Sequence, residues 1–233
     1  MKNPLKCLKP FDIILWCCSV GAVIVSFFIG GAENLLSLVA SLVGVTALIL
    51  IARGHVVGQM LMICFAILYG IISLEQRYFG EMITYVGMSM PMAVAATVSW
   101  LRHPYDDTSE VRVNRLTRKA ILPITLASTA VSIAFYFILG ALGNASLIVS
   151  TLSVTTSFLA ASFSFLRSPY FAVAYAANDL VLIILWSIAA VTDPSAVAMI
   201  ICFVTFLVND LYSFLCWRTM ERRQFVRDKA NGK

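Results

Sequence analysis

Eight uninterrupted apolar runs of about 20 residues each constrain this chain more than any other feature of its sequence. They occupy residues 13–30, 35–52, 56–74, 82–101, 120–140, 147–166, 170–191 and 195–217. Only helices and closed barrels cross a bilayer, because every backbone N–H and C=O group there must be paired within the protein. Barrel strands alternate apolar and polar residues, whereas these runs are continuously apolar. Only 12% of the residues are charged, about half the usual fraction in soluble domains. We therefore expect an all-α membrane protein with eight transmembrane helices.

The basic residues predict the orientation of these helices. If the N-terminus is cytoplasmic, 16 of the 17 Lys and Arg residues fall on the cytoplasmic side and only Arg77 falls outside. This segregation is typical of inner-membrane proteins. We expect a multi-pass protein of the bacterial cytoplasmic (inner) membrane with both termini in the cytoplasm. No small-residue cleavage site clearly follows the first run, so we interpret it as a retained helix rather than a signal peptide. The basic segment 219–233 is expected to meet the anionic lipid bilayer rather than nucleic acid.

Two stretches of the chain share one layout. Each contains an apolar helix, a basic turn (Arg53-Gly-His or Arg167-Ser-Pro), a second helix, a short turn and a third helix that ends near a Trp, Trp100 or Trp217. Two triplets of this kind have the same orientation only if one further helix separates them, and the run 120–140 supplies it. Parallel repeats are typical of transporters with a site between the halves. The predicted organisation is a leading segment 1–34, a first three-helix repeat 35–102, a loop and linker helix 103–146, a second repeat 147–218 and a tail 219–233.

Polar residues inside the apolar runs are the candidates for a binding site. Asn178-Asp179 lies near the middle of the seventh run and Asn209-Asp210 in the eighth. A charged side chain at the centre of a span costs about 2.5–3.5 kcal/mol, so these residues should face the interior of the bundle or water. They either join helices by hydrogen bonds or contact a solute. We favour solute contact for the asparagines and helix packing for the aspartates.

Helical spacing groups these residues with aromatic side chains. In the seventh run, Tyr175, Asn178 and Trp186 share one face, and in the eighth, Asn209 and Tyr212 share another. Aromatic faces stack on a ring and amides hydrogen-bond to its edges, so we expect a site for a planar, partly polar solute. An interfacial aromatic belt is the alternative for Trp186 and Trp217. The predicted substrate-binding residues are Gln59, Tyr69, Tyr85, Tyr175, Asn178, Trp186, Asn209 and Tyr212.

The sequence carries no motif for catalysis or for a cofactor. HExxH, GxSxG, P-loop and dinucleotide-binding patterns are all missing, and the two histidines have no ligand cluster beside them. We expect no metal, no cofactor and no enzymatic activity. An intramembrane aspartyl protease built on Asp179 and Asp210 is the enzymatic alternative. It is disfavoured because neither residue lies in a Tyr-Asp or Gly-x-Gly-Asp context.

Several motifs, in this order, resemble the PnuC family of bacterial vitamin transporters. They are Tyr69-Gly70, Phe79-Gly80-Glu81, Met90-Pro91-Met92 with Trp100, Asn178-Asp179 with Trp186, and Asn209-Asp210-Leu-Tyr212 with Trp217. The resemblance covers approximately residues 35–223. It implies a SWEET-like arrangement of three, one and three helices after the leading helix, and a homotrimer. It also implies facilitated diffusion of nicotinamide riboside, a small nucleoside, with phosphorylation by a cytoplasmic kinase trapping the solute.

The resemblance places the site between the repeats, at Asn178, Trp186 and Asn209, with Gln59, Tyr69 and Tyr85 from the first repeat. Riboside carriers often end the first repeat with a Trp-x-x-Trp pair, and here Thr97 stands at the first position. Ala93 stands where an amide is often found. These departures leave thiamine and riboflavin as alternatives within the family. A substrate-capturing membrane subunit of an ATP-driven importer is the other alternative.

Overall fold

The computed structural model describes residues 7–29, 35–75, 79–106, 108–144, 146–191 and 196–232, and within these ranges the chain is helical with one isolated β-bridge. In the part of the chain that the structure describes, eight helical segments are long and apolar enough to cross a membrane, in agreement with the predicted number. The fourth segment is built from three consecutive pieces: α4, η2 and α5. Arg77 lies outside the described residues. The elements are α1 (Pro10–Ile29), α2 (Leu35–Ala52), α3 (Val56–Glu75), α4 (Phe79–Met82), η2 (Ile83–Ser89), α5 (Met90–Arg102), α6 (Arg118–Ala141), α7 (Leu147–Phe165), α8 (Tyr170–Ala189) and α9 (Val197–Ala230).

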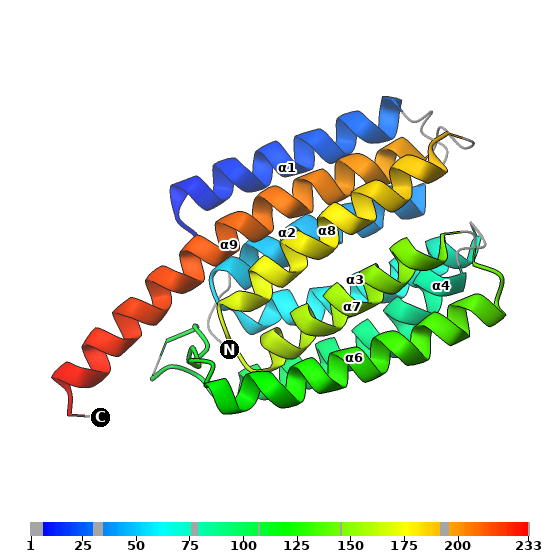
Figure 1. Ribbon diagram of the computed structural model, residues 1–233. Coiled ribbons are helices and arrows are strands. Elements are labelled where there is room, and N and C mark those ends of the chain that lie inside the picture. The colour runs from blue at the N-terminus through cyan, green and yellow to red at the C-terminus, as the bar shows by residue number, and fades with distance from the viewer. Residues whose placement is uncertain are drawn as a thin grey trace.

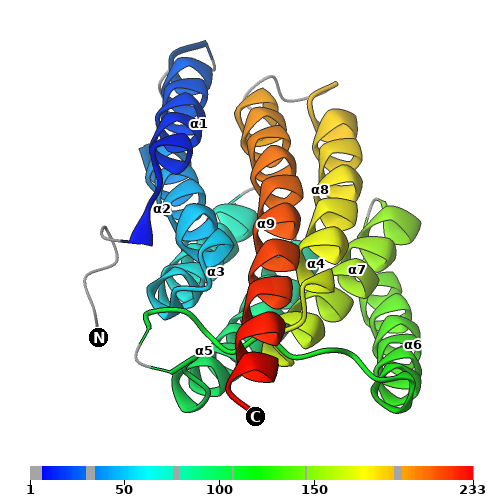
Figure 2. The ribbon, with the colours of Figure 1, turned by 90° about the vertical axis from the view of Figure 1, so that its left-hand side faces the viewer.

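The helices form a bundle with α1 and α6 at opposite sides (Figures 1 and 2). α1 packs on α2 and α9, and α6 packs on α7. Between them, α2 contacts α3 and α9, while α7 contacts α8 and α5. Loop 103–117 and the last turns of α9 lie at one end of the bundle, which we call the loop end. The opposite end is called the far end.

The fourth segment contains a wide, π-helical stretch. η2 covers seven residues, Ile83–Ser89, and Pro91 stands at the start of the α-helix that follows. Proline has no backbone N–H, and its ring clashes with the carbonyl four residues earlier. Widening the preceding turns removes this conflict, and such widened segments often lie at functional sites. The chain therefore accommodates Pro91 by a π-helical segment that precedes the proline.

α9 is longer than predicted, because it continues past Trp217 to Ala230. Loop 103–117 packs on this extension. Gln224 accepts a hydrogen bond from Val113 N at 2.8 Å and donates one to Val111 O at 3.0 Å. Glu221 lies 3.3 Å from Arg115 and 2.7 Å from Arg218. These contacts stabilise helix beyond the apolar run, and they join the segment 219–230 to the loop.

The turns after α2 and α7 have the same backbone geometry. Gly54 and Arg167 take the left-handed conformation, with φ of 65° and 58°. Their carbonyls accept hydrogen bonds from the loop, from Val111 N and Asn114 N respectively, both at 3.0 Å. The residue that corresponds to Arg167 is therefore Gly54, one position later than the Arg53 that the sequence pattern suggested. A left-handed conformation is free of strain for glycine and unusual for arginine.

Two tryptophans connect two helix groups, α2–α5 and α7–α9, at the loop end. Trp100 Nε1, in α5, donates to Ser164 O in α7 at 2.9 Å, and Trp217 Nε1, in α9, donates to Ile51 O in α2 at 2.8 Å. The two rings lie 5.2 Å apart. Trp217 is completely buried, so it does not belong to an interfacial aromatic belt.

Close packing of α2 and α3 at the loop end depends on Gly58. A Cβ atom at this position would lie 2.7 Å from Ala47 O and 2.7 Å from Ile51 N, and neither backbone atom can move independently. We expect Gly58→Ala to lower the free energy of unfolding by about 1–3 kcal/mol, the usual range for overpacking. The measurement is the midpoint of thermal unfolding of the purified protein in detergent.

Gly21→Ala, in α1, is the matched control, because a Cβ atom there would meet nothing within 4 Å. Alanine is intrinsically better than glycine in a helix by about 1 kcal/mol, so this variant should be unchanged or slightly more stable. Equal stability of the two variants would contradict the proposed packing constraint.

Candidate functional site

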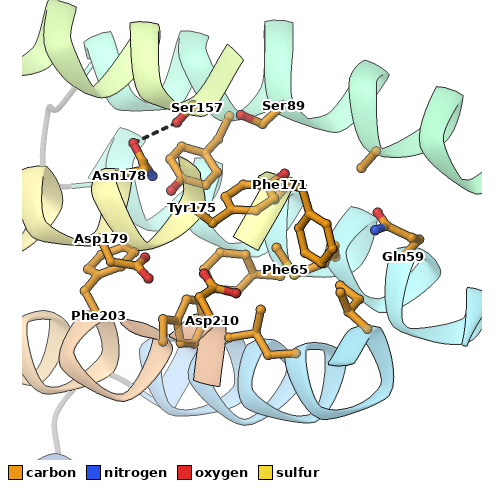
Figure 3. Close-up of a pocket in the computed structure, with 17 residues that line it drawn as sticks. Gln59, Phe65, Ser89, Ser157, Phe171, Tyr175, Asn178, Asp179, Phe203 and Asp210 are labelled. Atoms are coloured by element: carbon orange, nitrogen blue, oxygen red, sulfur yellow. Dashed lines mark hydrogen bonds between the residues drawn. The ribbon is translucent and has the colours of Figure 1, made fainter. Parts of the chain in front are cut away.

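A cavity lies inside the bundle, between α2, α3, the η2–α5 segment, α7, α8 and α9 (Figure 3). Its volume is about 40 Å³, enough for roughly two or three water molecules. A ring-sized solute therefore fits only after side chains or helices move. The residues that line it are Leu48, Ile51, Gln59, Met62, Phe65, Ala66, Tyr85, Ser89, Ala93, Ser157, Phe171, Tyr175, Asn178, Asp179, Phe203, Phe206 and Asp210.

The amide of Asn178 is oriented by three hydroxyl groups of α7. Ser153, Thr156 and Ser157 donate to Asn178 Oδ1 at 3.4, 2.9 and 3.0 Å. With the amide oxygen occupied in this way, the amide nitrogen is turned toward the cavity, as Figure 3 shows. Among the described residues Nδ2 has no hydrogen-bond partner. Asn178 therefore offers the cavity two N–H donors in a fixed direction.

Two carboxyl groups face the cavity beside this amide. Asp179 in α8 and Asp210 in α9 are 3% and 2% exposed, and Figure 3 shows both carboxyl groups pointing into the cavity and toward each other. Asp179 Oδ2 and Asp210 Oδ1 are buried and have no hydrogen-bond partner among the described residues. Unpaired buried acceptors are rare in proteins and call for an explanation. Hydrogen bonds between packed helices, which we expected for the aspartates, do not account for these two oxygen atoms.

Aromatic side chains close the far end of the cavity. The rings of Tyr69 and Tyr85 lie 4.2 Å apart, and Trp186 Nε1 donates to Tyr69 Oη at 2.9 Å. Phe203 packs edge-on against Tyr69 at 5.8 Å. Glu81, on the same segment as Tyr85, is buried, and neither of its carboxyl oxygens is hydrogen-bonded within the described ranges. This aromatic layer joins α3, η2, α8 and α9 on the far-end side of the polar groups.

The loop end of the cavity is closed by Gln59 and by the tryptophan pair. Gln59 Nε2 donates to Ser164 Oγ at 2.9 Å, which joins α3 to α7. Phe171 packs at 4.8 Å on the ring of Trp217, which itself lies against Trp100. The cavity is thus bounded by aromatic layers on both sides, with its amide and carboxyl groups between them.

The eight predicted site residues fall into three groups. Gln59, Tyr85, Tyr175 and Asn178 line the cavity. Tyr69 and Trp186 belong to the aromatic layer that closes its far end. Asn209 and Tyr212 do not line it, and their part in substrate binding stays a prediction.

Asn209 and Tyr212 face α1 instead. Asn209 Nδ2 donates to Ser19 Oγ in α1 at 3.0 Å. The hydroxyl of Tyr212 donates to Asp12 Oδ1 at 2.6 Å and accepts from Arg53 at 2.9 Å, while Arg53 and Asp12 form a two-point ion pair at 2.7 Å. α9 is covered on two sides, so both of its polar stripes are buried. The polar residue of α9 that lines the cavity is Asp210, which directly follows Asn209.

Sequence reasoning did not assign Phe65, Phe203, Phe206 and Asp210 to the site, although all four line the cavity. A signal for them is present in α9. Phe203, Phe206, Asp210 and Trp217 follow one another by 3, 4 and 7 residues, which places them on one helical face. The same spacing was used for α8, where it identified cavity residues.

The arrangement is suited to binding rather than to covalent chemistry. It combines a directed amide donor, two carboxyl groups and several aromatic rings in an enclosed space near the middle of the spans. Sites of this composition hold a planar solute by stacking and fix its orientation by a few hydrogen bonds.

Comparisons with known proteins agree with this picture. The chain is 21% identical over 201 residues to the nicotinamide riboside transporter PnuC of Neisseria mucosa (strain ATCC 25996 / DSM 4631 / NCTC 10774 / M26), covering 84% of this chain and 76% of that protein. The structure resembles the crystal structure of the vitamin B3 transporter PnuC with a TM-score of 0.82 at 20% identity, over 93% of this chain and 94% of the other. This likeness establishes a common fold.

Residues 34–219 match the family described as "Nicotinamide mononucleotide transporter". The match covers more than half of the 233 residues and all the helices that surround the cavity. The chain is therefore a member of the nicotinamide mononucleotide transporter family, the family to which PnuC belongs.

Proposed function

We propose that this protein carries nicotinamide riboside across the bacterial inner membrane by facilitated diffusion. The observation that carries the proposal is the unpaired Asn178 amide nitrogen beside two carboxyl groups in an aromatic cavity. The nicotinamide ring offers a flat face for Tyr85 and Phe65, and its carboxamide oxygen accepts from Asn178. The name of the Neisseria mucosa relative supports the same solute.

The charge of the cavity favours the riboside over its phosphorylated form. Among the described residues that line the cavity none is Lys, Arg or His, whereas two are Asp. A phosphate group would meet carboxylates in a poorly solvated site without a compensating cation. Retention of the solute in the cell then follows from phosphorylation by a cytoplasmic kinase, because the product no longer fits the carrier.

We propose that transport depends on the movement of two three-helix units of the same orientation relative to each other. α2, α3 and the α4–η2–α5 segment form one unit, α7, α8 and α9 form the other, and α6 connects them. Matching turns at Gly54 and Arg167, and matching tryptophan bonds to Ile51 and Ser164, support this SWEET-like 3+1+3 plan. Rocking of the units about the cavity would expose it to each side in turn.

Loop 103–117 and the C-terminal part of α9 are proposed to lie in the cytoplasm. Their basic residues support this orientation by the positive-inside rule. A homotrimer is proposed on the family resemblance. Thiamine and riboflavin remain the alternative solutes, and a capture subunit of an ATP-driven importer remains the alternative role. A non-enzymatic role is consistent with membership of a transporter family.

Removing Asn178 or Trp186 tests the site. We expect Asn178→Ala and Trp186→Ala each to weaken the affinity for riboside about tenfold or more, equivalent to about 1.4 kcal/mol. The first loses the directed donor, and the second loses the bond that holds Tyr69 over the cavity. Affinity is measured on purified protein by titration calorimetry. Tyr136→Ala, in the exposed face of α6, is the control and should bind normally. Normal affinity of both site variants would reject the site.

Uptake by the purified chain tests the mechanism. Proteoliposomes that contain only this protein should take up labelled riboside with saturable kinetics, without ATP and without a sodium or proton gradient, until the internal and external concentrations are equal. A riboside kinase and ATP enclosed in the vesicles should raise the retained label above that level. Dependence on an ion gradient would contradict facilitated diffusion, and lack of uptake despite binding would favour the importer subunit.

A further inference from the structure

We propose that Asp179 and Asp210 together supply the counter-charge that makes the cavity selective for a positively charged, planar solute. This inference rests on the proposed function and narrows it. Nicotinamide riboside and thiamine each contain a cationic ring, whereas riboflavin is neutral. The carboxyl pair would thus decide between solutes that the aromatic walls alone do not distinguish.

The geometry of the pair is the first argument. The two carboxyl groups come from neighbouring helices, α8 and α9, and point into the same cavity. Two adjacent carboxyl groups in apolar surroundings cannot both be ionised unless positive charge is close. Their uncompensated burial near the centre of a span is unfavourable. The chain retains both carboxyl groups at this position, although two asparagines would pack in the same volume.

Among the residues that the structure describes, none provides a cation for the pair. The polar and titratable side chains that face it are Asn178, Tyr85, Tyr175 and Cys202, and none is basic. Arg53, at the loop end, is engaged by Asp12. A mutual hydrogen bond between the carboxyl groups would satisfy only their facing oxygen atoms. Asp179 Oδ2 and Asp210 Oδ1 remain without a partner in the described part of the chain.

A second observation at the same cavity points to a ligand independently of the acids. Asn178 is 3% exposed, and its amide nitrogen has no partner among the described side chains, although three hydroxyl groups hold its oxygen. Aromatic rings at Phe65 and Tyr85 add faces that attract a cation. One planar cation with a carbonyl group would pair the amide donor, the carboxylates and the rings at once.

The test compares two solutes that differ in charge. Nicotinamide riboside carries a pyridinium cation, and its 1,4-dihydro form has nearly the same size and no charge. Titration calorimetry with the purified full chain is expected to give at least about tenfold tighter binding of the cation. Thiamine and riboflavin are titrated in parallel as a second cationic and neutral pair.

Two nearly isosteric variants assign the effect to the pair. Asp179→Asn and Asp210→Asn remove negative charge with little change of volume. Each should weaken binding of the cation about tenfold or more, and should change binding of the dihydro form by less than about threefold. Glu75→Gln is the matched control, because it removes a carboxylate at an exposed position at the end of α3. It should keep the full preference for the cation.

The outcomes separate this inference from the proposed function. Equal affinity of the wild-type protein for both riboside forms overturns the inference, and so does a preference that survives in both Asn variants. Binding of thiamine without riboside removes the proposed vitamin and leaves the charge selectivity in place. Binding of riboflavin alone, or of none of the four solutes, overturns the inference. If the Asn variants fail to fold, the wild-type comparison decides.

Discussion

Two reciprocal hydrogen bonds from indole to carbonyl hold the bundle together at the loop end. Ile51 O and Ser164 O each accept a bond from the turn that follows, from Gly54 N and Arg167 N, and a second bond from a tryptophan of the other helix group. The carbonyls are available because the last turn of a helix leaves its C=O groups without intrahelical partners. The left-handed turns thus fix the carbonyl positions, and the tryptophans fix the helix groups to each other.

The matching turns also relate the two walls of the cavity. Phe65 follows Gly54 by eleven residues, and Asn178 follows Arg167 by eleven. Positions at the same distance from the turn therefore carry an aromatic ring in α3 and an amide in α8. At the next position α3 has Ala66 and α8 has Asp179. Among the described lining residues, α7–α9 supply the Asn178 amide, both carboxyl groups and four of the six rings, whereas α2–α5 supply Phe65, Tyr85 and Gln59. The cavity is therefore asymmetric, and its charge lies on the α7–α9 side.

The sequence predicted the spans well because bilayer thickness dictates the length of each apolar run. It did not predict the end of α9, since Gln224 and Glu221 hold that extension through contacts with a loop more than 100 residues away. On α8, where one stripe is polar, helical spacing predicted Tyr175 and Asn178, which line the cavity. On α9 the predicted residues Asn209 and Tyr212 face α1, because helical spacing alone does not show which of two buried stripes faces α1 and which faces the cavity.

Within the described residues, the two closures of the cavity are held by different contacts. At the loop end, the bonds donated by Trp100, Trp217 and Gln59 all cross between the helix groups. At the far end, within the described residues, Trp186 donates to Tyr69 and ring contacts between Tyr69 and Tyr85 add to this bond. Each bond contributes about 1 kcal/mol net, so among the described residues separating the helix groups at the far end breaks fewer polar contacts. η2 lies in that half, where its widened turns are already distorted from α-helix. The described contacts therefore resist opening least at the far end.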